Sequence, residues 1–258
     1  MRYNAAMRFP MILLGAFLAL AGCATPQSVP DTVTITLVGL NDVHGELTAS
    51  DERGGLVSVS AYVDALREVR ARDGGAVLLI DAGDMWQGTL ESNLAEGAAM
   101  VDAYNAMGYI AAAVGNHEFD DGPEVLRGFM DAVEFPVLMS NADVSREPLL
   151  SDVIQKSVVV EKGGERIGLI GLTPIDTDEL SSPGPNVVFT DPVGAVQAEV
   201  DKLTEMGVNK IIVLSHSGYG VDQQVAANTT GVDVIVGGHT NTLLGDMEGA
   251  AGSYPTMV

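Results

Sequence analysis

Gly115-Asn116-His117-Glu118-Phe119-Asp120 directly follows an apolar run, residues 109–114, that predicts a buried strand. Ligands bind at the carboxyl ends of strands in α/β sheets. Asn116 offers an amide oxygen to a metal ion, and His117 can exchange a proton near neutral pH. Asp120 is close enough in sequence to hold one imidazole nitrogen of His117. A polar turn with a satisfied histidine is the alternative, and this stretch alone does not separate the two.

The other three His of the chain occupy similar positions, each beside Gly after an apolar run. Their blocks are Asn41-Asp42-Val43-His44-Gly45-Glu46 after residues 32–38, Ser215-His216-Ser217-Gly218 after residues 210–214, and Gly237-Gly238-His239-Thr240 after residues 232–236. A fifth run, residues 76–80, leads into Asp81-Ala82-Gly83-Asp84. If such blocks fill about a tenth of the chain, chance would place all four His in them on the order of once in ten thousand sequences. The pattern therefore favours one shared polar site.

These blocks, in this order, resemble those of the calcineurin-like metallophosphoesterases: Asp42-Val43-His44, Gly83-Asp84, Gly115-Asn116-His117-Glu118, Ser215-His216 and Gly238-His239-Thr240. The flanks narrow the resemblance to the bacterial 5'-nucleotidase family, through Asn41-Asp42-Val43-His44-Gly45, Gly83-Asp84-Met85-Trp86-Gln87-Gly88-Thr89 and Asn116-His117-Glu118-Phe119-Asp120. The similarity extends from about Thr34 to Val258. It implies an α/β fold, a four-layer αββα sandwich of two mixed sheets with helices outside.

The resemblance also implies two divalent metal ions, and Mn, Zn, Fe, Co and Ni all suit ligands of these types. Carried over position by position, the ligands are Asp42 and His44 for the first metal, Asp84 as the bridge, and Asn116, His216 and His239 for the second. The family has His or Gln two residues after the last of these. This chain has Asn241 there, so the corresponding ligand to the first metal is in doubt.

His117 is not a metal ligand in the family. It faces the phosphoryl group, stabilises the transition state and can protonate the leaving oxygen, while Asp120 orients its ring. Two dications, the carboxylates of Asp42 and Asp84 and one bound hydroxide leave a net charge of about +1, which suits a phosphate dianion. The resemblance therefore implies hydrolysis of phosphate esters, in particular nucleotides, by in-line attack of a metal-bound hydroxide.

Two alternatives remain at this point. A 2',3'-cyclic nucleotide phosphodiesterase or a sulfur-compound hydrolase of the same superfamily would use nearly the same ligands. The second alternative is a surface lipoprotein that binds metal but does not turn over a substrate. The intact His117 and Asp120 argue against that second alternative. Asn241 argues for it, and so does the C-terminal domain that the family has after this region and that this sequence does not include.

Composition excludes one class of partner. The chain carries 35 acidic and 13 basic residues in 258, a net charge of −22. Such a surface repels nucleic acid and anionic lipid, so we expect a small phosphorylated substrate and no nucleic-acid partner. The local positive charge that an anionic substrate needs would come from the bound metal ions.

The first residues predict an export signal and not part of the fold. Arg2 and Arg8 precede an apolar stretch, residues 11–20, that is too short for a permanent membrane span. It ends in Leu20-Ala21-Gly22-Cys23, which resembles a bacterial lipoprotein signal, in which the Cys becomes the lipidated first residue. We therefore expect a signal peptide over residues 1–22, a tether over residues 23–32, and an exported protein that Cys23 anchors to a membrane facing the periplasm or exterior. An ordinary secretory signal with an incidental Cys is the alternative.

The remaining pattern alternates strands with helices over residues 33–258, the expected catalytic domain. Predicted helices cover residues 56–72, 93–107, 123–133, 192–206 and 223–228, and residues 153–172 predict a hairpin around Gly163-Gly164. Residues 254–258 have the pattern of a strand that begins there. The family continues with more sheet and a nucleoside-binding domain, so the catalytic domain is expected to be incomplete at its C-terminus. Trp86 is expected in the core, Asp81 as a loop cap, and Glu118 in local backbone contacts.

Overall fold

The computed structural model describes residues 32–50 and 54–258. Residues Val33–Val258 form one compact unit. The expected signal peptide, Cys23 and all of the tether before residue 32 lie outside the described residues. No helix within the described part of the chain is both long and apolar enough to cross a membrane.

The first sheet contains four strands in the order β1-β2-β3-β4, and all neighbouring pairs are parallel. Its strands are β1 (Ile35–Leu40), β2 (Ala76–Asp81), β3 (Ala111–Ala113) and β4 (Val137–Leu138). The register pairs Leu40 with Asp81, the last residues of β1 and β2. Because parallel strands end at the same edge, the polar loops after β1, β2 and β3 emerge side by side.

The second sheet has the order β10-β9-β7-β6 and is mixed. Its strands are β6 (Ser157–Lys162), β7 (Glu165–Leu172), β9 (Ile211–Ser215) and β10 (Val234–Gly237). β6 and β7 form the predicted antiparallel hairpin, with Gly163 and Gly164 at φ 60° and 79° in its turn. β9 pairs in parallel with β7 and with β10, and β5 (Ala142–Asp143) pairs with β8 (Val188–Phe189) separately.

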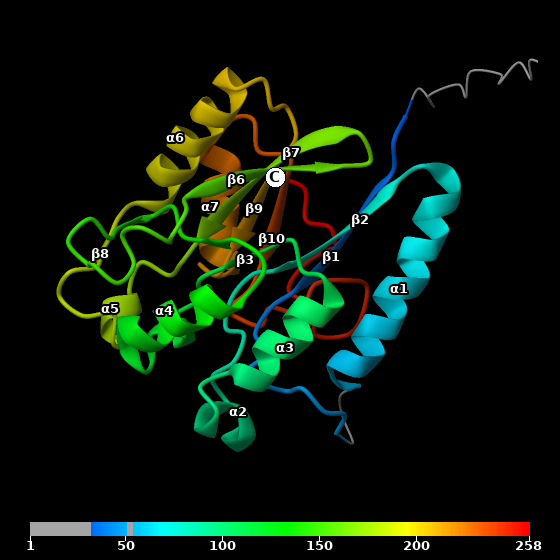
Figure 1. The fold of residues 1–258 in the computed structure, drawn as a ribbon. Helices are drawn as coiled ribbons and strands as arrows, with labels where there is room; N and C mark the ends of the chain where they lie inside the picture. The colour runs from blue at the N-terminus through cyan, green and yellow to red at the C-terminus, as the bar shows by residue number, and fades with distance from the viewer. Residues whose placement is uncertain (1–31, 51–53) are drawn as a thin grey trace, which may run out of the picture. The chain divides into compact units, whose positions relative to one another are not determined.

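The outer face of the first sheet is covered by α1 (Gly55–Asp73), α3 (Ala98–Met107) and α4 (Gly122–Ala132), and that of the second by α6 (Pro192–Glu205) and α7 (Tyr219–Asn228) (Figure 1). Two short helices, α2 (Leu90–Leu94) and α5 (Thr177–Leu180), and a 3-10 turn at His117–Phe119 lie in the connecting segments. Strand residues alternate between layers: Leu79 of β2 faces α1, α3 and α4, whereas Leu78 and Ile80 pack between the sheets. On β9, Leu214 packs between the sheets and Val213 faces α6 and α7. The αββα sandwich is therefore confirmed, with a first sheet that is parallel and not mixed.

Three expected elements differ from the structure. The single helix expected over residues 93–107 is two helices, because Gly97 adopts a left-handed φ of 77° between α2 and α3. α7 begins at Tyr219, four residues before the expected start, at the left-handed Gly218. Residues 254–258 form no strand, so that expectation was wrong.

Candidate metal centre

The loops after β1 and β2 are joined by backbone hydrogen bonds. Asp42 N–H donates to the Gly83 carbonyl and His44 N–H to that of Asp84, both at 3.0 Å. Among the described residues, six other than Gly have positive φ, and five of them are predicted ligands: Asp42, His44, Asp84, His239 and Asn241. A left-handed φ is uncommon for such residues, and strained backbone clusters at functional sites. The bent loops bring Asp42, His44, Asp84 and His239 together, whereas Asn241 stays exposed.

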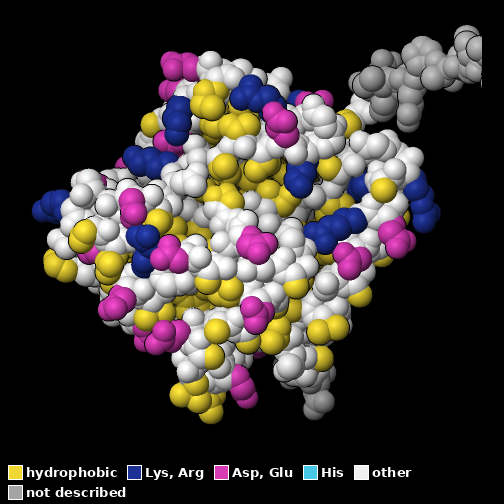
Figure 2. Space-filling model, in the orientation of Figure 1, with side chains coloured by type: hydrophobic (Ala, Val, Ile, Leu, Met, Phe, Trp, Pro, Cys, Tyr) yellow, Lys and Arg dark blue, Asp and Glu magenta, His cyan; other side chains and the backbone are white. Residues whose placement is uncertain are grey.

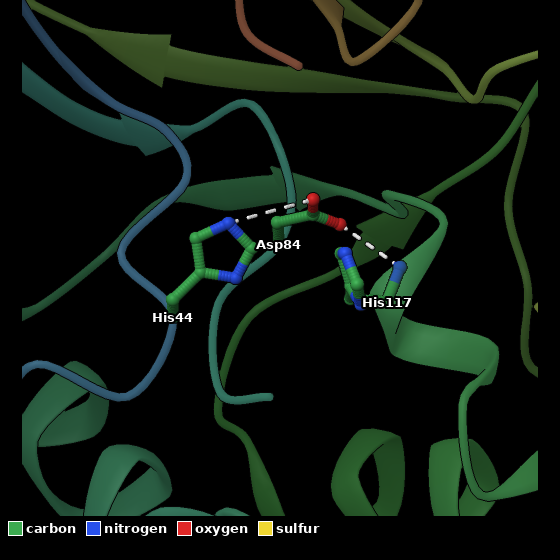
Figure 3. Close-up of side chains that lie close together, drawn as sticks. All are labelled: His44, Asp84 and His117. Atoms are coloured by element: carbon green, nitrogen blue, oxygen red, sulfur yellow. Dashed lines mark hydrogen bonds and ion pairs between the residues drawn. The ribbon is translucent and has the colours of Figure 1, made fainter. Parts of the chain in front are cut away.

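Asp84 lies at the centre of the site and is 2% exposed. Its Oδ1 accepts a hydrogen bond from His117 N–H at 3.0 Å, and its Oδ2 lies 2.8 Å from His216 Nε2 and 3.9 Å from His44 Nε2. Figure 3 shows the His44 ring and the His117 backbone on opposite sides of the Asp84 carboxylate. One carboxylate therefore contacts groups from the loops after β1, β3 and β9.

Two glycines create the space in which these groups meet. A Cβ on Gly83, at φ 101°, would lie 2.8 Å from His216 Nδ1. A Cβ on Gly115 would lie 2.2 Å from Asp84 Oδ1. Any side chain at either position would displace a predicted ligand, which accounts for the Gly next to Asp84 and Asn116 in the sequence.

The hydrogen bonds of two imidazoles leave Nε2 free as a ligand atom. His44 Nδ1 lies 2.8 Å from the Gln87 carbonyl, and His216 Nδ1 lies 2.7 Å from the Ala82 carbonyl. A carbonyl only accepts, so Nδ1 of each ring carries a proton, and Nε2 is the nitrogen that faces the site. Hydrogen bonds of this kind fix the tautomer of metal-binding His.

Two buried atoms of the site find no hydrogen-bond partner within residues 32–50 and 54–258: Asn116 Oδ1 and His216 Nε2. His216 Nε2 lies within ion-pair distance of Asp84 Oδ2, but not in hydrogen-bond geometry. A buried oxygen and a buried nitrogen lone pair beside a carboxylate are the arrangement that a cation would satisfy. The donor set therefore fits a divalent metal.

Candidate ligand atoms fall into two groups, each with all members within 4.8 Å of one another. The first group is His44, Asp84 and His117, and the second is Asp84, His216 and His239. Asp84 belongs to both groups. Asp42 lies beside them, because its Oδ1 is 3.9 Å from His44 Nε2 and 3.8 Å from His216 Nε2.

The electrostatics of the metal-free site agree with a cation-binding role. Burial raises the pKa of Asp84, but its contact with His216 outweighs this effect and the net pKa is lowered. Burial lowers the pKa of His216, yet Asp84 raises it overall to about 9. Burial, followed by the proximity of His216, lowers the pKa of His239, which favours its neutral form. When no metal is bound, His216 thus keeps a second proton beside the Asp84 carboxylate, and a metal ion would replace that proton.

His117 is oriented by a carboxylate. Its Nδ1 lies 2.7 Å from Asp120 Oδ2, and its ring contacts that of His44 edge-on with centroids 5.2 Å apart. Burial lowers the pKa of His117, but the bond to Asp120 and the charge of Asp84 outweigh it and the pKa is raised. The other oxygen of Asp120 accepts a hydrogen bond from Ser181, a residue that no sequence pattern had indicated.

Three supporting residues behave as expected. Glu118 accepts hydrogen bonds from the N–H groups of Asp84, Met85 and Gly115, and burial, then the charge of Asp84, raises its pKa to about 7. Asp81 accepts from Gly83 N–H at 2.8 Å, as a loop cap does. Trp86 is fully buried and stacked on Phe129 with ring centroids 4.0 Å apart.

Asn241 and Asn141 add two details. Asn241 is exposed, and its amide donates to the His239 carbonyl at 3.4 Å; with Asp42 and Glu46 it lines a cavity of about 360 Å³.

Asn141, for which the sequence indicated no role, is fully buried and exchanges two hydrogen bonds with the backbone of Thr173. It thereby joins the loop after β4 to the loop after β7.

Comparison with known proteins adds an independent line of support. The calcineurin-like phosphoesterase family model matches residues 35–242. A 5'-nucleotidase from Diplobatis ommata is 42% identical over 219 residues, which are 81% of this chain and 38% of that protein. A 5'-nucleotidase from Mus musculus is 38% identical over 274 residues, covering 98% of this chain and 46% of that protein.

A solved structure is similar as well. The 5'-nucleotidase precursor from Thermus thermophilus has a TM-score of 0.80 and 45% identity, over 87% of this chain and 46% of that one. The chain therefore spans less than half the length of each of these three proteins.

Proposed function

This chain belongs to the calcineurin-like phosphoesterase family, and we propose that it hydrolyses phosphate esters of nucleotides with two divalent metal ions. The observation that carries the proposal is the position of Asp84, whose Oδ2 lies 3.9 Å from His44 Nε2 and 2.8 Å from His216 Nε2, between the candidate ligands of the two metals. Paired metals at phosphoryl-transfer sites lie about 3.5–4 Å apart, a spacing that a bridging carboxylate provides. The 5'-nucleotidase relatives support nucleotides as the substrate class.

We assign one metal to Asp42, His44 and Asp84, and the other to Asp84, Asn116, His216 and His239. When bound, such ions polarise the phosphoryl oxygens and supply a nucleophile at neutral pH. In His44 and His216, Nδ1 donates to a backbone carbonyl, so Nε2 is the nitrogen of each ring that would bind a metal ion. Asp42 and Asp84 contribute two negative charges, which leaves the loaded site positive enough for a phosphate.

His117 acts on the substrate in this proposal. Its Nδ1 proton is held by Asp120 at 2.7 Å, so Nε2 carries the exchangeable proton and faces away from that carboxylate. The bond to Asp120 and the charge of Asp84 raise the pKa of His117, which favours the form of the ring that carries this proton. His117 then donates it to the leaving oxygen. A surface lipoprotein without turnover would have no use for this His–Asp pair, so the pair supports an enzyme.

A substrate panel tests the function. The full chain, loaded with Mn²⁺, would be incubated with AMP, UDP-glucose and 2',3'-cyclic AMP, and all products (phosphate, nucleoside, nucleoside monophosphate and sugar phosphate) would be separated and measured. We expect AMP to be hydrolysed fastest. The matched control is Asp84→Asn, which keeps the size of the side chain but removes its charge. Turnover of the cyclic nucleotide alone would instead support the phosphodiesterase alternative.

We also propose that the protein is exported and attached to a membrane through Cys23. Support comes from the sequence Leu20-Ala21-Gly22-Cys23 after a short apolar run. Cys23→Ala, expressed in a bacterium that processes lipoproteins, should lose labelling by a radioactive fatty acid. Undiminished labelling would contradict the anchor and leave the enzymatic proposal intact.

A further inference from the structure

Asp120 has both carboxylate oxygens engaged. Oδ2 lies 2.7 Å from His117 Nδ1, and Oδ1 accepts a hydrogen bond from the Ser181 hydroxyl at 2.8 Å. We infer that Ser181 is a positioning residue for the reaction proposed above: it fixes the carboxylate of Asp120, which in turn fixes the ring of His117 towards the leaving oxygen. This assignment rests on the proposed function.

The loop that carries Ser181 is attached to the turn that carries His117. Ser181 ends α5, where its N–H donates to the Thr177 carbonyl at 2.9 Å. The N–H of Ser182 donates to the carbonyl of Phe119 at 3.2 Å. Phe189 of β8, the strand that follows this loop, packs edge-on against Phe119 with ring centroids 6.2 Å apart. These contacts hold the Ser181 hydroxyl at a defined distance from Asp120.

A second hydrogen bond is needed because packing alone does not hold the pair. The side chains of His117 and Asp120 are 41% and 32% exposed. A carboxylate with one partner can rotate about its terminal torsion, which is a broad and nearly two-fold degree of freedom. With Ser181 on Oδ1, rotation would break two hydrogen bonds at once. The ring of His117 therefore keeps one orientation, and small errors in such orientation are costly for turnover.

Ser181→Ala removes the hydroxyl and tests the inference. In the metal-loaded full chain, we expect kcat for AMP to fall about 10-fold, the scale seen when a group that orients a site residue is lost, with KM changed by less than about twofold. The loss should be smaller for p-nitrophenyl phosphate, because its leaving group departs without a proton. A role in folding alone would reduce both activities equally.

Two further variants serve as controls. Ser181→Thr keeps the hydroxyl, and the extended backbone at φ −149° and ψ −159° accepts a β-branched residue, so activity should return to within about twofold of the original. Ser182→Ala changes the adjacent, exposed residue but keeps the backbone N–H that contacts Phe119, and it should behave like the unaltered protein.

A double-mutant cycle completes the test. In an Asp120→Ala background, Ser181→Ala should not lower kcat any further, because Ser181 acts through Asp120. An unchanged kcat in Ser181→Ala, an equal loss on both substrates without rescue by Thr, or an additive loss in the cycle would each overturn the assignment. A chain with no turnover on either substrate would overturn the proposed function and this assignment with it.

Discussion

At the scale of single residues, the backbone distinguishes the site from the rest of the fold. Asp42, His44 and Asp84 have φ values of 49°, 50° and 60°, which side chains other than Gly rarely adopt. The hydrogen bonds between the loops after β1 and β2 stabilise these conformations. Local strain of about 1–3 kcal/mol per residue is thus balanced by the surrounding structure, and it preorganises the candidate ligands.

The predicted ligands were recognisable because each lies directly after an apolar run, where a parallel strand must end. Ser181 was not recognisable, because it belongs to a loop of Ser, Pro and Gly whose sequence has no helix or strand periodicity. Its partner Asp120 lies 61 residues away, and only the folded chain shows the contact. Asn141 escaped recognition for the same reason, since its role is a tertiary hydrogen bond to Thr173.

His117 should serve chemistry and not metal binding. His117→Ala is expected to lose about 10²–10⁴-fold in kcat, the usual effect of removing a positioned acid or base. Its metal content, measured by elemental analysis, should not change, although His117 lies within 4.8 Å of the ligand atoms of His44 and Asp84. His216→Ala is the comparison, because it removes a fully buried candidate ligand and should lower metal content. Loss of metal from His117→Ala would make His117 a ligand.

Asn241 predicts an unequal pair of metal sites. Its amide oxygen is one methylene closer to the backbone than that of Gln, and its amide nitrogen contacts its own loop at His239. The first metal is therefore left with Asp42, His44 and Asp84 as firm protein ligands, against four for the second. Asn241→His should tighten the first site by roughly 10-fold. Calorimetric titration with Mn²⁺ would measure it, and equal affinities in the two forms would show that Asn241 already binds or takes no part.

At the scale of elements, the sequence pattern located strands better than helix ends. Apolar runs mark β2, β3 and β9 because strands buried on both faces carry few polar residues. The break between α2 and α3 escaped notice because Gly97 lies in an otherwise helical, Ala-rich stretch. Its cause is tertiary: a Cβ at Gly97 would lie 2.8 Å from Cγ of Trp86, which is fully buried and stacked on Phe129.

Gly97→Ala should therefore lower the stability of the fold by more than the strain of an Ala at a left-handed φ alone would. Gly74→Ala is the matched control, because Gly74 has the same φ of 77° but open space around its Cα. We expect Gly97→Ala to cost about 1–3 kcal/mol more than the control, the typical range for overpacking a core. Urea denaturation of both variants gives the two free energies of unfolding. Equal values would show that Trp86 moves aside without cost.

At the scale of the whole molecule, the acidic side chains do not form one patch on the visible face. Asp and Glu side chains on the face in Figure 2 are dispersed among apolar and basic ones. The net charge of −22 still opposes binding of anions at long range. Under the proposed function, the positive charge that a phosphate needs at the strand ends therefore comes from bound cations.

Removal of metal should lower stability as well as activity. Asp42, Asp84 and His216 are held close together in the fold, and a metal that binds only the folded chain stabilises it by about 2.7 kcal/mol at 100 times its dissociation constant. Thermal unfolding of the full chain should thus shift to lower temperature after chelation and recover with Mn²⁺. Asp84→Asn should show a smaller shift. A Tm independent of metal would contradict binding at this site.

The most direct test of the two-metal account is a single titration. Chelator-treated full chain would receive Mn²⁺ in steps of a fraction of an equivalent, and phosphate release from AMP would be measured at each step. The shared position of Asp84 predicts negligible activity without metal and a rise that reaches its plateau at two equivalents per chain. Activity that survives complete metal removal, a plateau at one equivalent, or no phosphate release at any metal level would contradict the account.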